Sequence, residues 1–140
     1  MHVGSLLLLC IMVIGVWQTG CEKPRDPVQI LKGFIPRIEH ALNHHDFSAL
    51  QSMGISPFDA GQFITDLRGP VASDTVSLRF VRVVFPRPTE AQLTLRMSKM
   101  TLEGHADRPV EIHLIEDGKW RIDGYSIPQP QPDSTGADRR

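Results

Sequence analysis

Five residues between positions 111 and 125 include acids, a histidine and a tyrosine, which are side-chain types that can transfer protons, together with an arginine. They alternate with apolar residues along two segments that flank the turn sequence Glu116-Asp117-Gly118. A three-residue turn with Gly118 left-handed puts Leu114 opposite Trp120, whereas a two-residue turn would separate the large apolar groups onto different faces. We therefore expect the three-residue turn and a shared polar face opposite Trp120, made of Glu111, His113, Arg121, Asp123 and Tyr125. Buried, such a face could transfer protons; in water, its charges would simply pair across strands.

Two histidines four residues apart, His40 and His44, have the spacing that lets two imidazoles on one helix face reach the same metal ion. No glutamate stands between them, so the zinc-protease motif is absent, and no third ligand is evident. We expect two solvated histidines, no bound metal and no cofactor. His45 falls on the apolar stripe of the same segment and is expected beside the core at the helix end.

Arg79 and Arg82 lie in an apolar-polar alternation whose phase changes between them, so they need not share a face. In a pocket one of them could hold an anionic ligand, and on the surface it is an ordinary solvated charge. The chain contains no nucleophile elbow, phosphate loop or cysteine-based catalytic motif. The sequence therefore assigns no catalytic residue.

The first 20 residues have the composition of an export signal. No Asp, Glu, Lys or Arg occurs between Met1 and Cys21, and residues 3–17 are almost wholly apolar. This run has the length of a signal-peptide core and is short for a helix that crosses the membrane. The residues Thr19-Gly20-Cys21 that follow it resemble a lipobox, in which small residues precede the acylated cysteine.

The lipobox resemblance implies signal cleavage between Gly20 and Cys21 and lipidation of Cys21. Gln18 stands where leucine is usual, and His2 stands where the leader usually carries Lys or Arg. An uncleaved N-terminal anchor, an ordinary secreted protein and an incorrect start at Met1 therefore stay open. The first two, like a lipoprotein, place the domain outside the cytoplasm.

Length and charge restrict the number of domains and the classes of partner. A chain of 140 residues has room for one domain, and a net charge of −1 gives no general attraction to nucleic acid. The longest run of basic residues is Arg139-Arg140, so we expect no nucleic-acid binding. The two cysteines are Cys10 and Cys21, and cleavage before Cys21 leaves the domain without a disulfide. Packing alone must then hold the fold together.

The first half of the domain has helical periodicity. Asp26 and Pro27 are a cap and a first helical residue, and the apolar stripe that follows is interrupted at Gly33 and Pro36. A short helix is expected over residues 47–53. Another is expected to start at Ser56-Pro57 and to end at Gly69-Pro70.

The second half alternates with the period of strands. Strands are expected over residues 75–85, 90–102, 108–116 and 119–127. The apolar phase changes partway along the first two strands, which indicates bulges and a strongly curved antiparallel sheet, although burial on both faces would give the same pattern. Residues 128–140 are rich in proline and polar groups and are expected to be a disordered tail.

Helices followed by four long bent strands, ending in Gly118-Lys119-Trp120-Arg121-Ile122, resemble the nuclear-transport-factor-two-like superfamily. The resemblance covers residues 27–127 and implies an α+β cone, cystatin-like in outline, whose N-terminal helices pack on a curved antiparallel sheet of four or more strands. It also implies a pocket between sheet and helices. Ketosteroid isomerases of this superfamily use an Asp base with a Tyr donor, but Asp123 and Tyr125 cannot be matched to those positions.

The sequence thus predicts a lipoprotein signal peptide (1–20), a tether (21–26), one α+β domain (27–127) and a tail (128–140). We expect a membrane-anchored extracytoplasmic lipoprotein that acts as a non-catalytic binding or interaction module of the cell envelope. The alternative is a small-molecule enzyme with an acid/base site in the cone, which burial of Glu111, Asp123 and Tyr125 in one pocket would favour. Expected partners are the membrane, through the N-terminal lipid, and a small ligand or an envelope protein. A homodimer and the choice between inner and outer membrane stay open.

Overall fold

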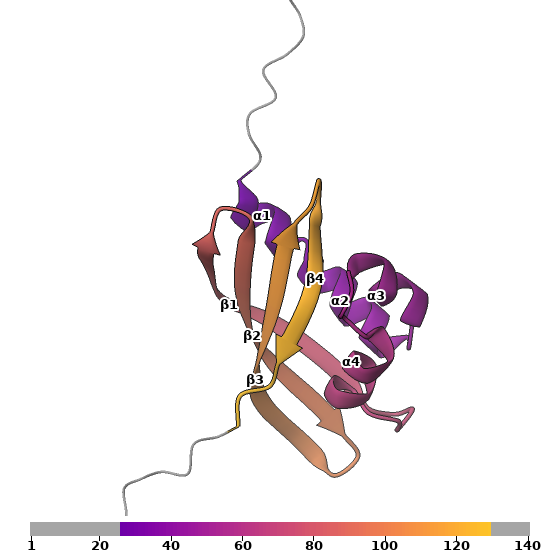
Figure 1. Cartoon of the computed structure of the whole chain (residues 1–140). Coiled ribbons are helices and arrows are strands. Elements are labelled where there is room, and N and C mark those ends of the chain that lie inside the picture. The colour runs from indigo at the N-terminus through magenta and orange to yellow at the C-terminus, as the bar shows by residue number, and fades with distance from the viewer. Residues whose placement is uncertain (1–25, 130–140) are drawn as a thin grey trace, which may run out of the picture.

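The computed structural model describes residues 26–129, in which four short helices precede a four-stranded sheet. The strands pair antiparallel in the order β1-β2-β3-β4. The bends of the long strands and the helices on one side give the domain its cone shape (Figure 1). The predicted α+β class is therefore confirmed. The elements are α1 (Pro27–Lys32), α2 (Phe34–Asn43), α3 (Phe47–Met53), α4 (Ala60–Leu67), β1 (Thr75–Arg87), β2 (Glu90–Thr101), β3 (Gly104–Glu116) and β4 (Trp120–Ser126).

The predicted signal peptide, the lipidation site at Cys21, nearly all of the tether and most of the tail lie outside the described residues. Those expectations therefore stay predictions. No helix within residues 26–129 is both long enough and apolar enough to span a membrane.

The first helical segment divides into α1 and α2, although the interruption expected at Pro36 is absent. Asp26 caps α1 by accepting a hydrogen bond from the backbone N–H of Val28 at 3.0 Å, and Pro27 is its first residue. The division falls at Gly33. Pro36 lies in the first turn of α2, where its missing N–H has no helical partner to lose.

The start of α4 differs from the prediction. Asp59, not Ser56, is the N-cap, and its side chain accepts from the backbone N–H of Gln62 at 3.0 Å. Ser56 and Pro57 occupy a preceding turn, which the hydrogen bond from Phe58 N to Ile55 O closes at 2.9 Å. Ser56 and Asp59 are both residue types that can cap a helix, so the sequence alone did not show which of the two begins α4.

One of the two predicted bulges is present. In β1, Phe80 pairs with Leu95 and Arg82 pairs with Thr94, so Val81 is an extra residue. The bulge predicted in β2 is wrong, because β2 pairs with β3 without interruption from Glu90 to Thr101. The apolar residues that suggested it, Met100 and Leu102, are exposed near the β2–β3 turn.

The β3–β4 turn has three residues, and Gly118 has a φ of 70°, as predicted. Its register is two residues away from the predicted one, since Leu114 pairs with Ile122 and Glu116 pairs with Trp120. A shift of two residues keeps every side chain on its face, so the apolar pattern could not distinguish the two registers. A further bulge at Asp123 was not predicted.

Side chains and backbone from the helical half complete both edges of the sheet. The Asn43 side chain accepts from Val76 N at 2.8 Å and donates to Val76 O at 2.9 Å. Glu39 Oε2 accepts from Leu78 N at 2.8 Å. At the other edge, Ile55 N donates to Ile122 O at 2.9 Å. These bonds fix the helices against β1 and β4 with little freedom to slide.

A buried glycine shows how closely the helices approach the sheet. Gly54 lies beside β4, and a Cβ added to it would come within 2.1 Å of Cδ1 of the buried Phe58 ring. The Phe58 ring is held in turn by edge contacts to Phe63 and Tyr125. We expect Gly54→Ala to lower the free energy of unfolding by about 1–3 kcal/mol, through overpacking.

Urea unfolding of Gly54→Ala can be compared with that of Gly124→Ala, where an added Cβ meets nothing within 4 Å. The control should change stability by about 0.5 kcal/mol or less. A smaller cost of Gly54→Ala in a Phe58→Leu background would locate the clash at that ring. Equal effects of the two single substitutions would contradict the predicted crowding.

Candidate functional site

The five residues predicted to share a polar face do not form one site. The bulge at Asp123 changes the phase of β4, so that Tyr125 pairs with Ile112 and lies on the helix-facing side of the sheet. Glu111, His113 and Arg121 stay on the opposite side, which we call the outer face. The predicted grouping of the acids with the phenol is therefore wrong.

Among the polar groups left on the outer face, the Glu111 carboxylate has local hydrogen-bond partners. Gln92 Nε2 donates to Glu111 Oε2 at 2.9 Å, and Ser126 Oγ lies 3.3 Å from the same oxygen. Within residues 26–129, Asp123 Oδ1 and Arg121 Nε are buried without a hydrogen-bond partner. The arrangement resembles the half-solvated face of an antiparallel sheet more than an enclosed acid/base site.

Tyr125 instead contacts α4. Its hydroxyl donates to Asp66 Oδ2 at 2.5 Å, and its ring meets Phe63 edge-on with 4.8 Å between ring centroids. Burial, followed by the hydrogen bond to Asp66, raises the pKa of Tyr125 above its ordinary value. The phenol therefore stays protonated and acts as a fixed donor between β4 and α4.

Asp66 has all of its acceptors in use. Its other carboxylate oxygen accepts from Gln62 Nε2 at 2.7 Å, and its backbone carbonyl accepts from Arg108 Nη2 at 2.6 Å. Asp66 thus connects α4 to β3 through its backbone carbonyl and to β4 through its carboxylate, and it has a structural role. Sequence reasoning missed Asp66 because nothing in the periodicity of α4 distinguishes it from a solvated helix residue.

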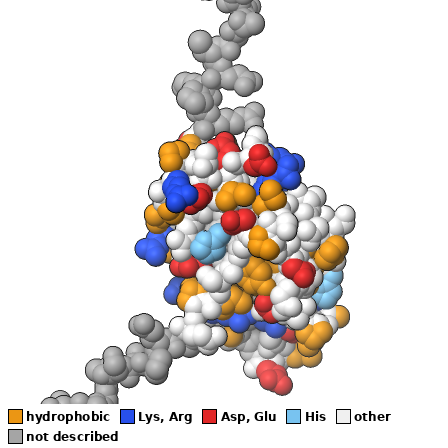
Figure 2. Space-filling model, viewed as in Figure 1, with side chains coloured by type: hydrophobic (Ala, Val, Ile, Leu, Met, Phe, Trp, Pro, Cys, Tyr) orange, Lys and Arg blue, Asp and Glu red, His pale blue; other side chains and the backbone are white. Residues whose placement is uncertain are grey.

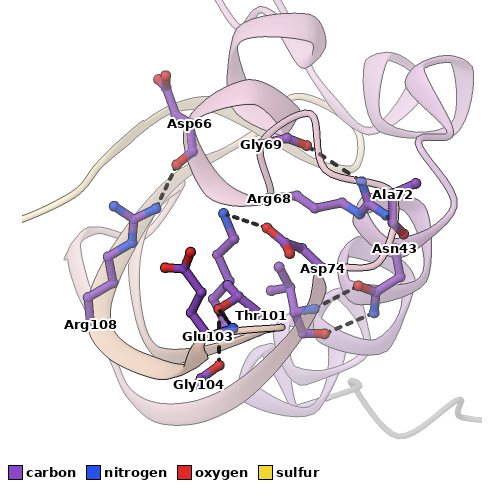
Figure 3. Close-up of polar contacts among 12 residues, drawn as sticks. Asn43, Asp66, Arg68, Gly69, Ala72, Asp74, Thr101, Glu103, Gly104 and Arg108 are labelled. Atoms are coloured by element: carbon purple, nitrogen blue, oxygen red, sulfur yellow. Dashed lines mark hydrogen bonds and ion pairs between the residues drawn. The ribbon is translucent and has the colours of Figure 1, made fainter.

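Two buried charges close the far end of the cone, between α4 and the β2–β3 hairpin (Figure 3). Asp74 is 4% exposed and pairs with Lys99 at 3.3 Å. Arg68 is also 4% exposed, and its Nη2 donates to the Ala72 carbonyl at 3.0 Å. These contacts fix the loop between α4 and β1.

The ring of His45 contacts the Arg68 guanidinium, although His45 was expected beside the core. It is exposed and has a φ of 51°, because it follows the last turn of α2. The apolar stripe ends one turn earlier, and the chain reverses at His45. Its contact is polar and lies at the domain surface.

His40 and His44 lie on the exposed side of α2. Their rings stack with 4.0 Å between centroids, and His44 Nδ1 lies 2.8 Å from the His40 carbonyl oxygen. Within residues 26–129 no three His, Cys, Asp or Glu side chains gather in a way that could hold a metal. The pair has the local contacts expected of solvated helix residues.

A hollow of about 590 Å³ lies where β1, β2 and β3 bend. Arg79 and Arg96 line it and are directly paired across β1 and β2. Both are exposed, and they alternate with the buried residues Leu78, Leu95 and Met97, so they lie on the outer face. The remaining lining is contributed by Phe80, Val81, Thr94, Leu95, Asp107, Arg108 and Pro109.

The Val81 bulge brings Arg82 to the same face as Arg79. Residues three apart on a regular strand point to opposite sides, but the extra residue restores Arg82 to the outer face opposite Thr94. Arg82 Nε lies 3.5 Å from Thr94 Oγ1. Figure 2 shows Lys and Arg side chains at the left of the visible face, on the side of β1, and others at its upper right and lower edge. Sequence reasoning had left open whether the two arginines share a face, and it did not single out Arg96.

Solved structures share the arrangement of helices and bent strands. A chain named Rd1NTF2_05 with five substitutions matches at 12% identity, covering 74% of this chain and all of that one, with a TM-score of 0.57. The domain has the nuclear-transport-factor-two-like cone fold. Rv3472, a protein of unknown function from Mycobacterium tuberculosis, matches at 14% identity over 82% of this chain and 80% of its own, with a TM-score of 0.56. A protein from Catenulispora acidiphila matches at 12% identity over 72% and 89%, with a TM-score of 0.51.

No protein-family model and no curated protein sequence matches the chain. At identities of 12–14%, the structural matches establish the fold and leave the activity open. In this nuclear-transport-factor-two-like domain the middle of the cone is filled by side chains that are 0% exposed, namely Leu93, Leu95, Met97, Val110 and Ile112. The hollow at Arg79 and Arg96 lies on the other side of the same strands.

Proposed function

We propose that the protein is a non-catalytic binding module of the cell envelope, tethered by a lipid on Cys21, whose ligand or partner occupies the outer-face hollow. The observation that carries this proposal is the hollow itself, in which two arginines that form no ion pair within residues 26–129 lie beside exposed apolar surface. Binding sites of this kind combine a concave surface with a few polar groups that fix orientation.

The contacts of the acid and phenol groups favour binding over catalysis. Glu111 and Tyr125 lie on opposite faces of the sheet. Tyr125 is held by Asp66 in a contact that also connects α4 to the sheet, and edge contacts from Phe58 and Phe63 surround its ring. A general acid or base must reach a substrate proton, whereas Glu111 accepts a hydrogen bond from Gln92 and Tyr125 donates one to Asp66.

The position of the N-terminal end supports a tethered arrangement. α1, which Asp26 caps, lies at the same end of the domain as the β1–β2 and β3–β4 turns, while the β2–β3 turn lies at the opposite end (Figure 1). A lipid on Cys21, five residues earlier, would hold the first end toward the bilayer. The hollow would then be open from the side of the domain, within reach of a soluble ligand or another envelope protein.

Site-specific photo-crosslinking in intact cells tests this proposal. We expect p-benzoylphenylalanine in place of Val81, which is 54% exposed and lines the hollow, to give a discrete adduct. The matched control replaces Phe47, an exposed aromatic residue on α3 outside the hollow, and should give none. An adduct of twice the chain mass would identify a second copy as the partner. Adducts of equal yield at both positions would contradict a specific site.

A further inference from the structure

We propose that the hollow binds a small organic anion, with one carboxylate or phosphate head held jointly by Arg79 and Arg96 and an apolar body over Val81 and Pro109. This inference rests on the proposed binding role of the hollow and specifies the chemistry of its ligand. It follows from the charges that the strand register brings together.

The pairing of Arg79 with Arg96 is unfavourable without an anion. Residues directly opposite on antiparallel strands have Cβ atoms roughly 5 Å apart, and like charges at that distance destabilise the sheet. Within residues 26–129 neither guanidinium forms an ion pair or a side-chain hydrogen bond. The only ion pairs there join Arg87 to Glu90 and Lys99 to Asp74.

Two arginines that are paired directly across neighbouring strands can bring both of their guanidinium groups to a single oxyanion. Each guanidinium is planar and can donate two parallel hydrogen bonds to a carboxylate or phosphate. A head placed between Arg79 and Arg96 would receive donors from both sides and cancel their repulsion. Arg82, on the same face beyond the bulge, adds positive charge at the rim.

The rest of the lining restricts the ligand to one anionic group. Val81 and Pro109 are exposed apolar side chains beside the arginine pair. Asp107 also lines the hollow and pairs with Ser98, two residues along β2 from Arg96. A second anionic group extending along β2 and β3 would meet this carboxylate, so a polyanion fits less well than a single head with an apolar body.

NMR titration of the purified protein with phenyl phosphate and with inorganic phosphate tests the site. We expect both to shift the amide signals of residues 79, 81, 94 and 96. Phenyl phosphate should bind about tenfold more tightly, because its ring buries apolar area that inorganic phosphate lacks. Arg96→Gln should weaken phenyl phosphate at least about tenfold. The matched control, Arg87→Gln, removes an arginine at the other end of β1 and should leave binding unchanged.

Thermal unfolding separates a ligand-binding role from a structural one. Without ligand, Arg96→Gln should melt at the same temperature as the natural protein or higher, because it removes a like-charge pair. Phosphate should raise the melting temperature of the natural protein and not that of Arg96→Gln. A lower melting temperature for Arg96→Gln without ligand would assign the arginine a structural role and overturn the inference.

The remaining outcomes also decide between hypotheses. A specific crosslink at Val81 without any binding of either phosphate would overturn the anion site and leave the binding module intact. Tighter binding of a deoxythymidine oligonucleotide than of phenyl phosphate, lost in Arg96→Gln, would mean a polyanionic ligand and would also overturn it. Failure of both the crosslink and the titration would reject the proposed function as well.

Discussion

Replacing Trp120 with alanine is expected to lower the free energy of unfolding by about 3–5 kcal/mol. Trp120 is 8% exposed and meets the Phe85 ring edge-on, with 6.1 Å between centroids. It belongs to the same buried core cluster as Phe34 of α2 and Met53 of α3, so its indole helps to hold the β3–β4 hairpin against the helices. Because the described domain contains no cysteine, no disulfide offsets the loss.

The adjacent residue on the opposite face is the matched control for this substitution. Arg121→Ala should change stability by about 0.5 kcal/mol or less, because Arg121 is half-buried and its Nε has no partner in residues 26–129 to lose. Urea unfolding of both variants measures the difference. A larger loss for Arg121→Ala would show that the outer face, not the helix-facing one, carries the main packing of this hairpin.

Cys21→Ser should abolish lipid attachment and release the protein from the membrane fraction or leave it unprocessed. A serine hydroxyl cannot take the thioether-linked lipid, and without the acyl chains the main membrane affinity is lost, at about 0.8 kcal/mol per buried methylene. Mass spectrometry of the mature N-terminus and membrane fractionation measure the two effects.

Cys10→Ser is the control for the lipid prediction, because Cys10 is the only other cysteine and belongs to the predicted leader. It should be processed and anchored like the natural protein. An N-terminus other than Cys21, or an unmodified Cys21 in the natural protein, would reject the lipoprotein hypothesis and favour a retained anchor or simple secretion.

The periodicity of the sequence predicted the helices and strands, because an element that buries one face repeats its apolar residues with the period of that element. The bulge at Val81 was visible as a change of apolar phase, which the structure confirms. The bulge at Asp123 produced a weaker signal in the sequence. Ile122 and Tyr125 are three residues apart and share a face, but the phenol was counted among the polar side chains. The apolar residues Met100 and Leu102 led to the opposite error, since they are exposed but suggested a bulge that is absent from β2.

The candidate site could not be predicted from one strand at a time. Arg79 and Arg96 are significant only as a pair, and their pairing depends on the register between β1 and β2. Asp66 and Tyr125 are 59 residues apart in the sequence and meet through the packing of α4 on the sheet. Local patterns carry no information on either contact, because both depend on how distant elements are placed.

The hydrogen bonds that the Asn43 and Glu39 side chains form with the backbone of β1 also bear on aggregation. An open strand edge is a template on which a second chain can add its own strand. If the proposed lipid holds many copies of the protein on one bilayer, such edges would meet often. Here α2 occupies the backbone groups of Val76 and Leu78, and farther along β1 the bulge at Val81 and the ring of Pro86 disturb the edge. The same helix that builds the core therefore protects the protein from aggregating with its neighbours.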